Sequence, residues 1–259
     1  MTRNLALLSL LLLSLAACGP ASADAGDPAD PLLVAAASDL QFAFGEIARL
    51  YEEETGRPVR VTFGSTGNLT AQIENGAPYD VLAAANVAYV EQLDEQGLIV
   101  SGTKQLYARG RLALVVNRQS GLHVSRLDDL RDAAVRRVAI ANPEHAPYGL
   151  AAQQALQSAG VWDAVRDRLV LGENVSQTLQ FVQTGDAPVG IVALSIADVP
   201  EVQGALLDED LHDPIDQVMA VIQGSPREDA ARDFVRFVNG PVGQEIMVQY
   251  GFVLPGESD

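Results

Sequence analysis

Two patterns of apolar and polar positions alternate along most of the chain. Short apolar runs of four to six residues are followed by longer segments in which apolar residues recur every three or four positions. The first pattern is typical of buried strands and the second of amphipathic helices. The predicted strands cover residues 32–37, 59–63, 80–84, 111–116, 137–141, 168–171, 188–193 and 218–222.

Helices are predicted between most of these strands, and several of their ends carry typical residues. Gly56 is placed as a C-terminal glycine, and Pro226 follows Ser225 in a capping box that ends at Glu228. The predicted helices cover residues 39–54, 68–74, 87–96, 147–158, 175–183, 225–238 and 241–251.

The alternation of strands and helices predicts an α/β fold in which parallel sheets carry helices on both faces. The 259 residues are enough for two lobes of ordinary size. Because a strand returns at 218–222, we expect one lobe to comprise residues 32–108 plus 218–259. The other lobe then comprises residues 109–217, with crossovers near Ala108 and Gln217.

The N-terminus has the features of an export signal. Residues 1–17 combine an early arginine with a leucine-rich core too short to span a bilayer. The ending Leu15-Ala16-Ala17-Cys18 resembles the bacterial lipobox, which implies that Cys18 is lipidated and becomes the first residue of a periplasmic, membrane-anchored protein. Residues 18–31 then form the anchor and a flexible tether. The alternative is an ordinary signal peptide followed by an incidental cysteine.

Composition narrows the class of partner. The formal net charge is −17, with 34 acidic and 17 basic residues. Nucleic acids and anionic lipid surfaces both require a basic footprint, so we expect neither as a partner. A small anion would not be attracted from a distance either, and a site for one must act through short-range contacts. Cys18 is the only cysteine, so the chain cannot form an internal disulfide.

Four junctions between a predicted strand and the next helix are rich in small or hydroxyl residues. Open α/β sheets bind ligands at such junctions, where helix N-termini present unpaired N–H groups. A helix cap or a tight turn is the alternative at each junction taken singly. The four junctions are Ala37-Ser38-Asp39, Gly64-Ser65-Thr66-Gly67, Ala146-Pro147-Tyr148-Gly149 and Glu173-Asn174-Val175-Ser176.

The loop FGSTGNL at residues 63–69 lacks the lysine of a nucleotide-binding loop, which favours an anion held by hydroxyls and amides alone. His145 is a possible base for an exported hydrolase, but no nucleophile motif lies near it in the sequence. Acidic residues are scattered rather than clustered at metal-ligand spacing, so we expect no resident metal or cofactor. A purely structural lipoprotein is a third reading, and it predicts no cleft that can close.

Several motifs together resemble the molybdate-binding proteins of ABC importers. They are VAAASDL, FGSTGNLTAQIENGAPYDVLAAAN, ANPEHAPYGLAAQQAL, ENVSQTLQFVQTGDAPVGIVALS and GPVGQEIMVQYGF, within residues 32–252. The resemblance implies a type II periplasmic-binding-protein fold, in which two α/β lobes joined by a hinge hold the ligand between them. It further implies molybdate or tungstate as cargo, a membrane permease as partner, and no enzymatic activity. We expect a monomer.

The resemblance also assigns site residues. It places Ser38 and Thr66 where the family offers hydroxyls to the oxyanion, with Ser65 as the alternative if the loop shifts by one residue. Tyr148 and Val175 fall where the family uses backbone N–H groups. Molybdate would be held through these residues, by its oxygens.

One position departs from the family pattern. Some members carry a tyrosine hydroxyl after the strand that reads Gly-Ile-Val, but here Ala193 follows and cannot donate. Either the Tyr148 hydroxyl replaces it or the site has one bond fewer. Asp39 is the nearest acceptor for a protonated oxyanion such as phosphate, and we expect its side chain to turn away and cap its helix. Sulfate remains an alternative cargo, because cavity size decides between it and molybdate.

Overall fold

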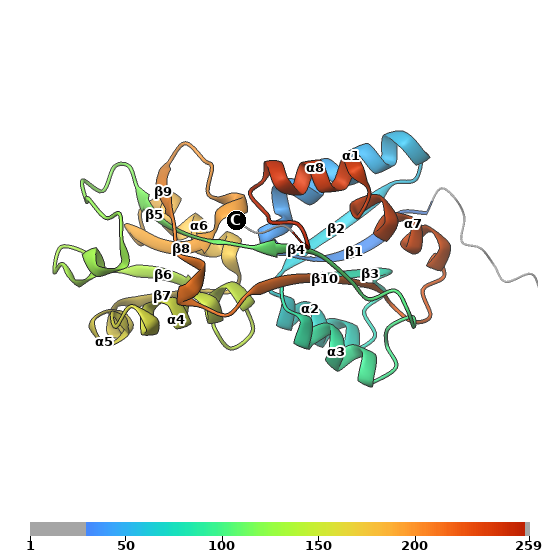
Figure 1. The fold of residues 1–259 in the computed structure, drawn as a ribbon, viewed down its shortest axis with the longest axis horizontal. Coiled ribbons are helices and arrows are strands. Elements are labelled where there is room, and N and C mark those ends of the chain that lie inside the picture. The colour runs from blue at the N-terminus through green and yellow to red at the C-terminus, as the bar shows by residue number, and fades with distance from the viewer. Residues whose placement is uncertain (1–29, 257–259) are drawn as a thin grey trace, which may run out of the picture.

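The described part of the chain forms two five-stranded sheets, each covered by helices (Figure 1). The structure is a computed structural model that describes residues 30–256, so the predicted signal peptide, Cys18 and nearly all of the predicted tether lie outside the described residues. The first sheet has the order β2 (Val59–Gly64), β1 (Leu32–Ala37), β3 (Val81–Ala84), β10 (Ile215–Val221) and β4 (Gln105–Gly110). The second has the order β7 (Leu169–Gly172), β6 (Val138–Ala141), β8 (Val189–Ala193), β5 (Leu112–Asn117) and β9 (Val202–Leu206). We call each sheet with its helices a lobe.

Helices lie on both faces of the first sheet. The face with α1, α7 and α8 buries Val34, Ala36 and Met219, whereas the face with α2 and α3 buries Ala35 and Leu82. Successive residues of a strand point to opposite faces, so a run such as LLVAAA in β1 must be apolar throughout. The helices of this lobe are α1 (Gln41–Thr55), α2 (Thr66–Glu74), α3 (Val87–Glu95), α7 (Glu228–Val238) and α8 (Pro241–Gln249).

The second lobe is built in the same way. Its helices are α4 (Pro147–Ser158), α5 (Trp162–Val165) and α6 (Val175–Thr184), and α4 and α6 contact the sheet directly. Short 3-10 helices complete the chain: η1 (Ser38–Leu40), η2 (Leu127–Arg131), η3 (Arg166–Arg168), η4 (Leu194–Ile196) and η5 (Glu209–Leu211). None of the helices within residues 30–256 has the length and apolar character needed to cross a membrane.

Two stretches of chain connect the lobes. The chain leaves the first sheet after Gly110 at the end of β4 and returns to it at Ile215, the start of β10. The predicted crossover residues Ala108 and Gln217 lie inside these strands, where they pair with each other, and the register shifts between Gln217 and Val218. The lobe limits derived from those two positions stay a prediction.

The α/β class is confirmed, but the expectation of parallel sheets is wrong in part. β10 runs antiparallel to β3 and β4, and β5 runs antiparallel to β8 and β9. Strands β4 and β9, which lie at sheet edges, were not predicted. Helix α7 begins at Glu228, because the Ser225 hydroxyl accepts from the Arg227 N–H and donates to Asp80 instead of starting the helix.

Candidate functional site

A small cavity lies between the lobes, at the ends of β1 and β2 and beside the N-termini of α4 and α6. All five predicted site residues, Ser38, Ser65, Thr66, Tyr148 and Val175, line it. The structure therefore brings together residues that are up to 137 positions apart in the sequence. The remaining lining residues are Ala37, Asp39, Gly64, Ala85, Ala146 and Pro147.

Three helices direct their N-termini to this cavity. Thr66 and Val175 are the first residues of α2 and α6, and Tyr148 is the second residue of α4. The first turn of a helix leaves its N–H groups without intrahelical partners and carries the positive end of the helix dipole. Within the described part of the chain, the lining contains no lysine or arginine. The site therefore offers neutral donors to an anion.

Thr66 and Ser65 differ in what their hydroxyls contact. The fully buried Thr66 accepts a hydrogen bond from the Ala85 N–H through Oγ1, at 3.1 Å. Since that bond occupies the oxygen as an acceptor, the hydroxyl proton is left to donate elsewhere. Ser65 Oγ lies 2.9 Å from His145 Nδ1, and the tautomer of His145 decides which of the two donates. This geometry favours Thr66 as the hydroxyl donor.

Contacts across the cavity hold the lobes together. The Gly67 N–H donates to the His145 carbonyl at 2.9 Å, and Ser176 Oγ donates to the Ser38 carbonyl at 3.0 Å. A β-carbon on Gly67 would lie 2.8 Å from that same carbonyl oxygen, so the approach requires a glycine. These contacts define a closed arrangement of the two lobes.

His145 lies between Ser65 and Glu173, which raises the hydrolase alternative again. His145 Nε2 is 3.9 Å from a Glu173 carboxylate oxygen, beyond the range at which a carboxylate orients a catalytic histidine. The Glu173 side chain is also 60% exposed and is hydrogen-bonded to Asn68. The arrangement is a contact between lobes rather than a working Ser-His-Glu triad.

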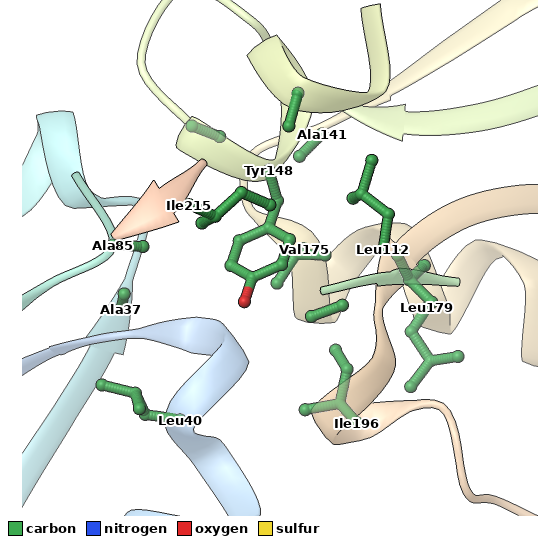
Figure 2. Packing of buried hydrophobic residues seen from close by; sticks show 14 of the residues in the cluster. Ala37, Leu40, Ala85, Leu112, Ala141, Tyr148, Val175, Leu179, Ile196 and Ile215 are labelled. Atoms are coloured by element: carbon green, nitrogen blue, oxygen red, sulfur yellow. The ribbon is translucent and has the colours of Figure 1, made fainter. Parts of the chain in front are cut away.

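The Tyr148 hydroxyl points away from the α4 backbone toward the segment that carries Leu40 (Figure 2). It donates to Asp39 Oδ2 at 3.0 Å, and Gln217 Nε2 donates to the same oxygen at 2.8 Å. Burial raises the pKa of Tyr148 well above its ordinary value, which keeps the hydroxyl protonated. A β-carbon on Gly110 would lie 2.0 Å from this hydroxyl oxygen, so the strand that links the lobes makes room for it.

The prediction that Asp39 turns away and caps its helix is wrong. Its side chain is 1% exposed, lines the cavity and binds Tyr148 and Gln217, and η1 has no side-chain cap. Burial raises the pKa of Asp39 to about 7. The side chain does not cap its helix because Asp39 lies between β1 and α1, where Tyr148 of the second lobe and Gln217 of β10 cover it.

Three residues that support Asp39 were missed in the sequence. Gln217 is a buried amide inside an apolar strand, and such a residue is a sign of a specific hydrogen bond. Ser195 Oγ donates to the Asp39 carbonyl at 2.7 Å. Nothing in the sequence around Gly110 indicated that this glycine makes room for the Tyr148 hydroxyl. Among the described residues, no group of three or more histidine, cysteine, aspartate or glutamate side chains could hold a metal ion.

Two α/β lobes that close over a small cavity are the architecture of a solute-binding protein. The chain belongs to the family of bacterial extracellular solute-binding proteins, which it matches over residues 32–253. The family consists of solute-binding proteins, so the hydrolase alternative has no support and the chain is not an enzyme.

Several of its relatives are named molybdate-binding proteins. The molybdate-binding protein ModA of Azotobacter vinelandii is 35% identical over 225 residues, which cover 85% of this chain and 89% of the relative. ModA of Rhodobacter capsulatus is 33% identical over 229 residues, covering 87% and 89%. These matches confirm the resemblance predicted from the motifs.

The fold is shared as well. The solved structure of the periplasmic molybdate-binding protein of Azotobacter vinelandii superposes with a TM-score of 0.81 at 32% identity, covering 86% of this chain and 99% of that one. The predicted two-lobe type II fold is thereby confirmed.

Proposed function

We propose that this chain captures molybdate or tungstate between its two lobes and delivers it to the membrane permease of an ABC importer. One observation carries the proposal: among residues 30–256, hydroxyls and helix N-termini line the cavity between the lobes and no basic side chain does. A fully ionised tetrahedral oxyanion has only acceptor oxygens, so donors alone satisfy it. The relatives that are named molybdate-binding proteins support this cargo.

In this proposal Ser38 and Thr66 donate their hydroxyls, and Tyr148 and Val175 donate backbone N–H groups. Ser65 is the alternative hydroxyl. Each charge-assisted hydrogen bond contributes roughly 1.5–3 kcal/mol, so about half a dozen support tight binding after the cost of closure. Neutral donors also avoid a buried cation that would lack a partner in the open, empty site. The protein then works as a monomer without a resident cofactor.

A panel of four anions tests the cargo. At pH 6.5 we expect molybdate and tungstate to raise the melting temperature, with a stabilisation of about 2.7 kcal/mol when the anion is at a hundred times its Kd. Phosphate should not raise the melting temperature, because its remaining proton needs an acceptor. Asp39 cannot be that acceptor, since it is mostly protonated below pH 7. Stabilisation by sulfate alone would make sulfate the cargo. Equal stabilisation by phosphate, or none by molybdate, would contradict the proposal.

We also propose that the protein is anchored in the membrane through a lipid on Cys18, as the lipobox-like sequence suggests. Mass spectrometry of the membrane fraction should then find a lipidated Cys18 as the first residue. The variant Cys18→Ser should yield an unprocessed or soluble protein. A free chain that begins beyond Cys18 would rule out the anchor.

A further inference from the structure

The carboxyl group of Asp39 is the only one among the described residues that line the cavity, and its two oxygens have different surroundings. Oδ2 accepts from the Tyr148 hydroxyl and from Gln217 Nε2. Oδ1 is equally buried but has no hydrogen-bond partner among the described residues. A buried polar atom without a partner is costly, so its position beside the cavity requires an explanation.

An ionised Asp39 would oppose the capture of a dianion. Two like charges that share a water-poor site repel each other strongly, and no lysine or arginine of the described lining offsets them. A proton on Asp39 removes this repulsion. Since Oδ2 already receives two donors, the proton belongs on Oδ1, where it turns the unpartnered oxygen into an O–H donor.

We propose that Asp39 contacts the bound anion as a neutral carboxylic acid that donates from Oδ1, so that each anion captured above neutral pH takes up one proton. This inference rests on the proposed function and adds a specificity-determining residue to the same site. It also supplies the donor that Ala193 cannot provide, while the Tyr148 hydroxyl stays bonded to Asp39 Oδ2.

The groups around Asp39 agree with this assignment. Burial raises its pKa to about 7, and it raises the pKa of Tyr107 from β4 and of Tyr148 from α4 well above their ordinary values. Gln217 from β10 and Ser195 from η4 are uncharged.

Two arginines lie in or next to β4, where the chain passes from one lobe to the other, and both contact groups other than Asp39. Arg109 pairs with Asp216, and Arg111 donates to the Gly251 carbonyl. Across the cavity, His145 contacts Ser65. Asp39 is therefore the group whose protonation a bound dianion favours most directly.

The direction of the pH effect follows from linkage. Below the pKa that Asp39 has in the free protein, the free protein already holds the proton, so binding takes up little. Above that pKa the free protein has lost the proton and must regain it, so the affinity should fall by about tenfold for each pH unit until the pKa of the complex is reached. The pKa of about 7 belongs to the closed arrangement, in which Asp39 is buried, and opening of the lobes would lower it. From pH 6 to pH 8.5 the loss therefore amounts to roughly thirtyfold or more.

Calorimetry with molybdate tests the inference. Titrations of the purified protein at pH 6, 7 and 8.5, each in two buffers of different ionisation enthalpy, measure both Kd and the protons taken up. We expect the uptake to rise with pH and to reach nearly one proton at pH 8.5. Asp39→Asn keeps a neutral donor, so it should bind at pH 6 within a few-fold of the wild type and lose both the uptake and the pH dependence. His145→Gln should keep the pH dependence, whatever its affinity.

A second variant covers the case in which Asp39→Asn does not fold. Tyr148→Phe keeps the ring and the backbone N–H but removes a hydrogen bond that lowers the pKa of Asp39. The pH at which affinity begins to fall should therefore move upward. An unchanged midpoint there, a pH-independent wild type, or the loss of pH dependence in His145→Gln would overturn the inference and leave the proposed function standing. A wild type that binds no molybdate at any pH would overturn both.

Discussion

Replacing Thr66 by valine is expected to weaken molybdate binding by about ten- to 150-fold. The two side chains have nearly the same shape, and Thr66 is fully buried, so the change removes little except the hydroxyl. One oxygen of the anion then loses its donor, which costs about 1.5–3 kcal/mol. The Ala85 N–H, which donates to Thr66 Oγ1, also loses its acceptor. Calorimetry at pH 6.5 measures the change in Kd.

Helix α2 offers a matched control one turn further on. Thr70 is 1% exposed and its hydroxyl has no hydrogen-bond partner in the described structure, so Thr70→Val should leave the affinity within about twofold of the wild type. Ser65→Ala separates the two candidate hydroxyls. If Ser65→Ala lowers affinity more than Thr66→Val does, the loop presents Ser65 to the anion and the assignment of Thr66 fails.

The strands that could be predicted from the sequence are mostly those buried on both faces. β1, β3 and β8 are continuous apolar runs between turn residues, and burial on both faces produces that pattern. The missed strands β4 and β9 are edge strands in which exposed and buried residues mix. The direction of these buried strands could not be predicted from the sequence either, because a strand buried on both faces is apolar throughout whether it pairs in parallel or antiparallel. The antiparallel placement of β10 follows from its return through the connection between the lobes.

The proposed donors of the site were predictable because each is a local feature. Ser38, Thr66, Tyr148 and Val175 all follow a strand and stand at or near the start of a helix, so the chain direction alone brings each of them to the carboxyl end of the strands in its own sheet. The surroundings of Asp39 are not local. Its partner Gln217 is 178 residues away in the sequence, and nothing in the Ser38–Leu40 segment indicates a second lobe above it.

Two glycines in the motifs FGSTGNLTAQIENGAPYDVLAAAN and ANPEHAPYGLAAQQAL now have a physical reason. Gly149 follows Tyr148 in α4, and a β-carbon there would lie 2.2 Å from the Ala141 carbonyl oxygen at the end of β6. Gly67 belongs to the other lobe, and a β-carbon there would lie 2.8 Å from the His145 carbonyl oxygen. The first glycine lets a helix pack against its own sheet. The second permits contact between the lobes.

Gly67→Ala is therefore expected to lower molybdate affinity without lowering the stability of the free protein. Its methyl group would overlap a backbone carbonyl of the opposite lobe, and a backbone atom cannot move aside as a side chain can. Overpacking of this kind costs about 1–3 kcal/mol, which corresponds to roughly a five- to 150-fold loss in affinity. In the open form that the proposed function requires, the lobes are apart, and alanine favours the first turn of α2 over glycine. The Tyr89 hydroxyl of the same lobe, 2.9 Å from the added β-carbon, is the end of a side chain and can move aside.

Gly45→Ala is the matched control for this substitution. Gly45 lies inside α1 with nothing within 4 Å of the added β-carbon, so the change should stabilise the protein by about 0.5–1 kcal/mol and leave Kd unaltered. Calorimetry gives the affinities, and small-angle X-ray scattering with saturating molybdate shows whether each variant still closes. If Gly67→Ala closes and binds as tightly as the wild type, the contact between Gly67 and His145 plays no part in capture. If Gly67→Ala binds weakly and its lobes stay apart with molybdate present, closure requires the hydrogen bond from the Gly67 N–H to the His145 carbonyl.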